Sequence, residues 1–224
     1  MGSDVKFKRP DGKEGSGYLA KASAGNAPGV VVIQEWWGLQ SQIKGICDRF
    51  AASGYTALAP DLYAGTVVPY HDTAAANKEM TSLNFLEATD QLVRGAAQHL
   101  KGSAAKVGLT GFCMGGAVTI IGAVRVPEFA AGVCYYGIPP AAAAKPSDVR
   151  VPLQGHFANQ DDWCTPAKVN ELEASLKQSK SKYEFYRYDA HHAFMNEARP
   201  EVYDAASAKT AWDRTLTFLT KAFA

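Results

Sequence analysis

The sequence KVGLTGFCMGGAV, residues 106–118, contains the features that decide the fold. A short apolar run ends at Gly111, and two more glycines follow at Gly115 and Gly116. A single cysteine, Cys113, lies between Gly111 and Gly115. A strand that ends in G-x-C-x-G and continues into a helix is typical of a nucleophile elbow, whose central residue is held at positive φ. Such a turn would present the thiol at a helix N-terminus, where the helix dipole favours negative charge. The alternative is a buried cysteine in a glycine-rich turn.

Strands and helices alternate on both sides of this turn. GVVVIQE (29–35) is a dense β-branched run, typical of a strand that is buried on both faces. The alternation predicts a mostly parallel, doubly wound sheet flanked by helices on both faces. No repeat or long linker divides the chain, so we expect a single domain, residues 1–224. The other expected strands are 5–9, 17–22, 55–60, 105–111, 130–137, 151–159 and 182–188, and the expected helices are 40–53, 73–101, 113–125, one starting at Thr165-Pro166, and 200–222.

The composition argues against several classes of function. The 224 residues are 47% hydrophobic and 20% charged with a net charge of +1. The sequence contains no basic run, so we expect no binding to nucleic acid. The apolar stretches are too short to span a bilayer, and the polar first residues predict no signal peptide and therefore a cytoplasmic location. We expect no metal, no organic cofactor and a monomer or small homo-oligomer. The cysteines show no spacing typical of a disulfide framework or zinc site: Cys47, Cys113, Cys134 and Cys164.

Two polar clusters follow the downstream strands. QGHFANQDDWCTP places Asp161 and Asp162 just past one expected strand, and RYDAHHAFMNE places His191 and His192 just past the next. The order Cys113, aspartate, histidine is the order of nucleophile, acid and base in hydrolases built on such sheets. The simpler interpretation is a turn or helix cap for the aspartates and a solvated loop for the histidines.

Five segments together resemble the dienelactone hydrolase family of the α/β-hydrolase fold: IQEWWG, DLYAG, GFCMGG, ANQDD and HHAF. The resemblance extends from about residue 5 to the C-terminus. It implies that Cys113 is the nucleophile of a covalent acyl-enzyme. It also implies that His192 is the base, because the family's histidine is followed after one residue by phenylalanine, here Phe194.

The resemblance offers two matches for the acid of the triad. Asp161 matches by its distance from Val151-Pro152, where the strand begins, whereas Asp162 matches by its distance to Pro166. We favour Asp161, because a strand fixes position better than a loop.

Glu35 resembles the family's glutamate that contacts the resting cysteine; its simpler interpretation is a turn residue at a strand end. The backbone N–H groups of Trp36 and Met114 would form the oxyanion hole. We expect aromatic and aliphatic side chains to line a pocket of low polarity: Trp36, Trp37, Tyr63, Tyr70 and Phe194.

The chain departs from the family at the substrate carboxylate. Dienelactone hydrolases hold that group with two arginines. The position of one is occupied by Asn196 here. The other would lie between Arg49 and Arg94, where the only lysine or arginine is Lys78. Arg199, just before a proline, is expected to face solvent. An amide lacks the charge of arginine, and a lysine lacks its bidentate fork, so we predict that neutral esters and lactones are preferred substrates.

The expected function is therefore cysteine-dependent hydrolysis of small carboxylic esters or lactones. One alternative is dienelactone hydrolase proper, a carboxymethylenebutenolidase. Another is a protein of the same fold that does not hydrolyse its ligand and acts in thiol or redox chemistry or in ligand binding.

Overall fold

The computed structural model describes residues 1–224, and eight strands form one sheet in the order β1-β2-β4-β3-β5-β6-β7-β8. The two pairs β1–β2 and β2–β4 are antiparallel, and the remaining pairs are parallel. This confirms the predicted mostly parallel sheet. The strands are β1 (Ser3–Lys8), β2 (Glu14–Ala20), β3 (Gly29–Ile33), β4 (Thr56–Pro60), β5 (Val107–Phe112), β6 (Phe129–Tyr135), β7 (Leu153–Gln160) and β8 (Tyr183–His191).

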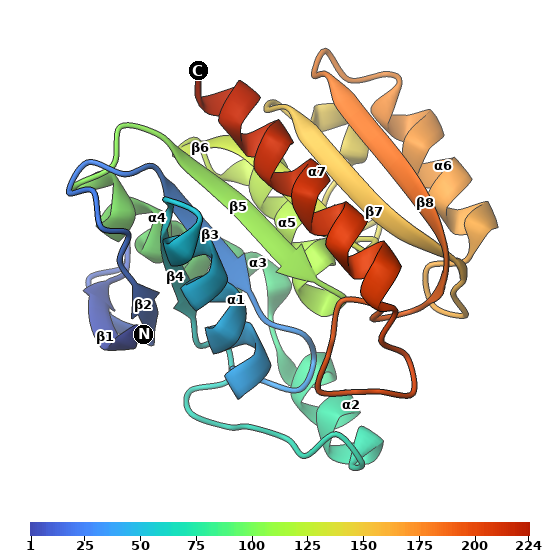
Figure 1. Ribbon diagram of the computed structural model, residues 1–224, viewed down its shortest axis with the longest axis horizontal. Helices are drawn as coiled ribbons and strands as arrows, with labels where there is room; N and C mark the ends of the chain where they lie inside the picture. Colours follow the sequence, from blue (N-terminus) through green and yellow to red (C-terminus); the bar gives the residue numbers. More distant parts are fainter.

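Helices cover both faces of the sheet, as expected for a doubly wound fold (Figure 1). One face carries α1 (Ser41–Ala52) and α7 (Ala205–Phe223). The other carries α4 (Arg94–Lys101), α5 (Met114–Arg125) and α6 (Pro166–Leu176). None of the helices combines the length and apolar character that crossing a membrane requires.

The apolar run of β3 is explained by burial on both sides. Val30 and Val32 belong to the core beneath α1 and α7, whereas Val31 and Ile33 belong to the core beneath α4 and α5. Successive side chains of a strand point to opposite faces, so a strand covered on both faces needs apolar residues at every position. The strand ends at Ile33, two residues earlier than expected, and Glu35 therefore lies in the loop beyond it.

The expected single helix over 73–101 is wrong, because the chain restarts at Asn84. Its side-chain oxygen accepts hydrogen bonds from two following backbone N–H groups at 3.1 Å, which is the geometry of an N-cap. The segment therefore divides into α2 (Thr73–Ser82), α3 (Phe85–Glu87), the π-helical turn η1 (Ala88–Val93) and α4.

The remaining differences lie in loops at the carboxyl edge. Asp204 caps α7 by accepting from the Ser207 N–H at 2.7 Å, so this helix begins at Ala205 and not near 200. The expected loop 137–149 contains the short 3-10 turn η2 (Pro146–Asp148). The parallel strands bring the loops after β3, β5, β7 and β8 to one edge of the sheet, beyond which α2 lies (Figure 1).

Candidate active site

Cys113 lies in the predicted tight turn between β5 and α5. Its backbone has φ 54° and ψ −115°, a conformation that side chains rarely adopt, and it immediately precedes the first residue of the helix. A Cβ at Gly111 would collide with the Gly115 carbonyl oxygen, and one at Gly115 would collide with the carbonyl oxygens at the end of β3. The flanking glycines are therefore required by the close approach of the backbone, and the strained turn projects the half-buried thiol into a cavity.

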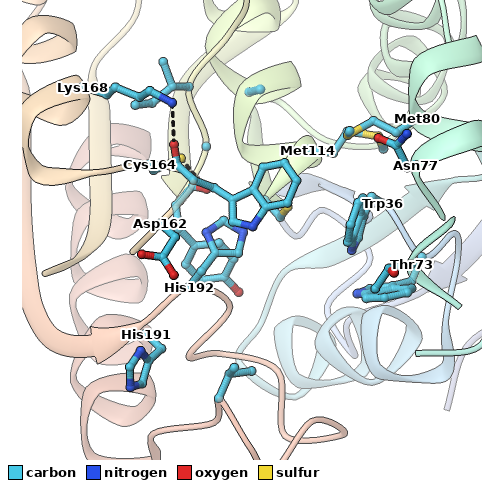
Figure 2. A pocket seen from close by; sticks show the side chains of 18 of the residues that line it. Trp36, Thr73, Asn77, Met80, Met114, Asp162, Cys164, Lys168, His191 and His192 are labelled. Carbon is cyan, nitrogen blue, oxygen red and sulfur yellow. Dashed lines mark hydrogen bonds between the residues drawn. The ribbon is translucent and has the colours of Figure 1, made fainter. Parts of the chain in front are cut away.

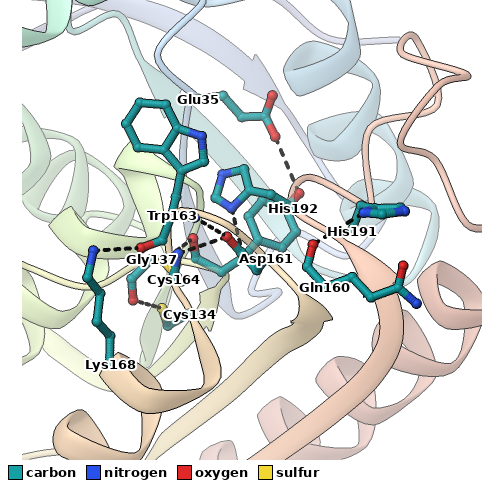
Figure 3. A network of polar contacts seen from close by, with 11 residues as sticks. Glu35, Cys134, Gly137, Gln160, Asp161, Trp163, Cys164, Lys168, His191 and His192 are labelled. Atoms are coloured by element: carbon teal, nitrogen blue, oxygen red, sulfur yellow. Dashed lines mark hydrogen bonds and ion pairs between the residues drawn. The ribbon is translucent and has the colours of Figure 1, made fainter.

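His192 and Asp161 form a hydrogen-bonded pair at the ends of neighbouring strands. The ring Nδ1 of His192 lies 2.7 Å from Oδ2 of Asp161 (Figure 3). The other oxygen, Oδ1, accepts from the backbone N–H groups of Trp163 and Cys164, both at 2.8 Å. Asp161 is 3% exposed, and these three contacts fix its carboxylate in one orientation.

The electrostatics of this pair favour a charged imidazole. Burial lowers the pKa of His192, but the negative charge of Cys113 and the bond to Asp161 outweigh it and raise the pKa to about 10. Burial also acts to raise the pKa of Asp161, but the contacts with His192 and with the two N–H groups lower it overall. The buried Nε2 of His192 makes no hydrogen bond of ordinary geometry, although Cys113 is close enough to shift the pKa of the ring.

The other member of each predicted pair, Asp162 or His191, does not join the Asp161–His192 contact. Asp162 and His191 are exposed and line the cavity, and in Figure 2 the side chain of His191 lies apart from His192. His191 Nδ1 lies 3.2 Å from the carbonyl oxygen of Gln160. The structure therefore brings Asp161, and not Asp162, to His192.

The two backbone N–H groups predicted to form the oxyanion hole have no hydrogen-bond acceptor within the protein. The Trp36 N–H donates to no other group of the protein. Met114 is the first residue of α5, so its N–H has no partner within the helix. Both residues line the cavity that contains Cys113.

Glu35 is buried, 3% exposed, and held by two neutral groups. Its Oε2 accepts from the Asn196 amide at 2.8 Å, and its Oε1 accepts from the Tyr136 hydroxyl at 3.3 Å. Burial raises the pKa of Glu35 despite the opposing contributions of Asn196, His192 and Arg199. Both carboxylate oxygens of Glu35 are thus bonded to Tyr136 and Asn196, and neither forms a hydrogen bond with Cys113.

A cavity of about 1230 Å³ opens over Cys113. Trp36 and Trp37 line it, as expected, and their rings meet edge to face at 5.0 Å. Three other expected lining residues do not line it: Tyr63, Tyr70 and Phe194. Phe194 is fully buried in the core beneath α7, and Tyr63 is buried with its hydroxyl 3.2 Å from the Met114 sulfur. An aromatic residue near a site motif in the sequence can point either into the cavity or into the core.

Arg199 also differs from the expectation, because it lines the cavity and is not fully exposed. Its guanidinium lies 5.5 Å from the centre of the Trp37 ring, and its Nε donates to Glu201 at 2.8 Å. Asn196, at the position of a family arginine, does not line the cavity and is used to hold Glu35.

The sequence analysis missed two residues of the site. Tyr136 follows β6 with φ 39°, holds Glu35 and meets the His192 ring edge to face at 5.1 Å. Trp163 lines the cavity beside Asp162 and is 57% exposed. The motif GxCxG gives no signal for Tyr136, whereas the position of Trp163 directly after the aspartate pair could have indicated it.

Asp161, Cys164 and His192 offer one possible metal ligand each within 4.8 Å of one another. Their donor atoms are already engaged: Asp161 and His192 bond to each other, and the Cys164 thiol donates to the Tyr136 carbonyl oxygen at 3.2 Å. Burial and the charge of Asp161 raise the pKa of Cys164, which opposes the thiolate that a metal needs. The cluster is therefore better explained as a hydrogen-bond network.

Comparisons with known proteins find similarity along nearly the whole chain. The profile of the dienelactone hydrolase family matches residues 16–223. A relative from Aquifex pyrophilus, named Protein usf, is 35% identical over 97% of both chains, and one from Aquifex aeolicus, provisionally named a carboxymethylenebutenolidase, is 31% identical over 97% of both. A solved structure from Klebsiella pneumoniae, provisionally named a dienelactone hydrolase, superposes with a TM-score of 0.86 at 27% identity, covering 97% of this chain and 98% of that one.

Proposed function

The chain belongs to the dienelactone hydrolase family, and from that membership we propose that it hydrolyses small esters or lactones through Cys113, Asp161 and His192. Its class is that of a carboxylic-ester hydrolase. The observation that carries the proposal is the placing of Cys113 on a strained turn, beside a histidine whose far nitrogen is held by a buried aspartate.

In the first half-reaction the Cys113 sulfur attacks the carbonyl carbon, and a C–S bond forms. The carbonyl electron pair moves onto the oxygen, which the N–H groups of Trp36 and Met114 stabilise. When the tetrahedral intermediate collapses, the C–O bond to the alcohol breaks, and the leaving oxygen takes the proton of the His192 imidazolium. Asp161 holds the ring in the required orientation throughout.

In the second half-reaction His192 has to act as a base. Formation of the thioester removes the negative charge of Cys113, which is the largest contribution that raises the pKa of His192. The pKa therefore falls, and the neutral imidazole accepts a proton from water as the water attacks the thioester. Collapse of the second intermediate releases the acid and the Cys113 thiolate.

Neutral esters and lactones fit this site better than carboxylate-bearing ones. The position of a family arginine is occupied by Asn196, whose amide is buried and committed to Glu35. Much of the cavity wall is apolar, including Met80, Leu83 and Ile138.

One observation favours dienelactone hydrolysis as a second candidate: Arg199 lines the cavity, and its two terminal nitrogens form no ion pair. A comparison of kcat/KM for a neutral lactone and cis-dienelactone separates the two candidates. If Arg199 holds a substrate carboxylate, Arg199→Ala lowers kcat/KM for the dienelactone alone.

The basic test is esterase activity on p-nitrophenyl acetate. We expect Cys113→Ala to lower kcat/KM by about four orders of magnitude, as when the nucleophile of a triad is removed. Cys164→Ala is the matched control, because Cys164 lines the same cavity but is buried and bonded to Tyr136. Activity that survives in Cys113→Ala would instead support a thiol-sensing or binding role.

A further inference from the structure

Trp163 is the only tryptophan among the large exposed hydrophobic residues, which are otherwise Met1, Val67 and Tyr203. It does not stand alone on the surface, because it lines the cavity over Cys113. Its ring meets Trp36 edge to face, with the centres 5.5 Å apart and the planes at 67°. In this geometry most of the indole surface is free to contact a ligand.

The backbone of Trp163 is fixed to the catalytic acid. Its N–H donates to Asp161 Oδ1 at 2.8 Å, and its carbonyl oxygen accepts from Lys168 Nζ at 3.2 Å. The same carboxylate holds His192 through Oδ2. The side chain of Trp163 therefore starts from a defined point next to the acid–base pair, as Figure 3 shows.

Trp163 lies where the alcohol half of the substrate is expected to bind. In the proposed mechanism, His192 donates a proton to the leaving oxygen, so the alcohol portion of the ester has to lie on the histidine side of the cavity. The lining of the cavity also includes Ile138, Pro139 and Pro140, which carry no charge. The Lys168 ammonium is turned toward the Trp163 carbonyl oxygen (Figure 2).

We propose, resting on the function proposed above, that Trp163 and Trp36 form an aromatic subsite for the leaving group, so that esters of arylmethyl alcohols are preferred over saturated ones of equal size. An aromatic ring placed on Trp163 gains edge-to-face or offset contacts that a cyclohexyl ring cannot make. Such contacts correspond to about a 3- to 10-fold preference in kcat/KM.

The test compares benzyl acetate with cyclohexylmethyl acetate. Both have the same acyl group, the same number of carbons and a primary alcohol as leaving group, so their intrinsic reactivities are similar, and the change in the rate ratio between wild type and Trp163→Leu reports the contribution of Trp163. In the wild type we expect benzyl acetate to be favoured by about 3- to 10-fold. We expect Trp163→Leu to bring the ratio close to one and Trp163→Phe to keep it above one.

The matched control is Tyr203→Leu, which removes an exposed aromatic residue that does not line the cavity and leaves the ratio unchanged. A wild-type ratio of one, or a preference that survives in Trp163→Leu, overturns the subsite while Cys113-dependent turnover leaves the proposed function intact. Turnover that persists in Cys113→Ala overturns the proposed function itself. Inhibition by benzyl alcohol gives a second readout: it should weaken in Trp163→Leu, and equal inhibition by cyclohexylmethanol contradicts the inference.

Discussion

The two walls of the cavity are built differently. The catalytic wall, which carries the proposed Cys113, Asp161 and His192 triad, lies at the ends of sheet strands, and there Asp161 accepts three hydrogen bonds. The opposite wall includes α2, of which only Ala76 is buried, and Ala76 packs with Trp37 and Val68 in a small cluster separate from the main core. Figure 2 shows Thr73, Asn77 and Met80 across the cavity from the catalytic side.

This difference indicates that the two walls have different roles. The sheet holds the reacting groups in one geometry, since any shift of a strand end would break several buried contacts. A helix with one buried residue opens at much lower cost in free energy. We therefore expect substitutions on the catalytic wall to change kcat and substitutions on α2 to change mainly KM.

The sharpest test of the catalytic wall is its acid. Asp161→Asn should lower kcat by about 10³- to 10⁴-fold, because an amide cannot stabilise the imidazolium and favours the wrong tautomer. Asp162→Asn should stay within about threefold, as is usual for an exposed substitution away from such contacts. Steady-state kinetics on p-nitrophenyl acetate measures both, and the reverse ranking would show that the Asp161–His192 bond is not used.

The hydrogen bond from Asn196 to Glu35 should contribute to stability, and its loss should have a smaller effect than the loss of the Asp161 carboxylate. Asn196→Ala removes the 2.8 Å hydrogen bond to the buried carboxylate and should lower the free energy of unfolding by about 1–3 kcal/mol. Urea denaturation at pH 8 measures the loss. In a Glu35→Gln background the same substitution should cost less, because no charge is left unpaired; an equal cost in both backgrounds argues against the contact.

The charge of Glu35 itself should be visible in the pH dependence of stability. Because burial raises its pKa in the folded state, the unfolded chain ionises first as pH rises, and stability is lost between the ordinary pKa of 4.5 and the raised one. Relative to Glu35→Gln, the wild type should therefore become less stable as the pH rises from 4 to 8. Parallel stability curves for the two proteins would show that the carboxyl is not destabilised by burial.

The smallest effects are expected on α2. Met80→Ala and Asn77→Ala each remove part of the wall and should raise KM by about two- to fivefold, with a smaller change in kcat. If kcat falls as far as in Asp161→Asn, the two walls do not divide the work as described.

The strand framework could be predicted from sequence because it depends on local patterns. The β-branched run at 29–35 and the glycines around Cys113 each have one physical explanation, and the structure shows both. Counting from the start of a strand led to Asp161, the aspartate that contacts His192. A strand rises by a fixed length per residue, so such a count is reliable.

The features that were missed depend on contacts between distant segments. Phe194 and Tyr63 are buried away from the cavity, while Arg199 and Trp163 line it, and no local pattern separates the two groups. The break at Asn84 was hidden because apolar spacing continues across it, although its capping side chain is a recognisable stop signal.

In the proposed mechanism Cys113 becomes acylated in every turnover. Wild type mixed with p-nitrophenyl butyrate and quenched in acid within the first turnovers can be digested and its peptides analysed by mass spectrometry. We predict a butyryl group on the peptide that contains Cys113, and its loss in Cys113→Ala. A butyryl group on the Cys164 peptide, or turnover with no acylated cysteine at all, would show that Cys113 is not the nucleophile.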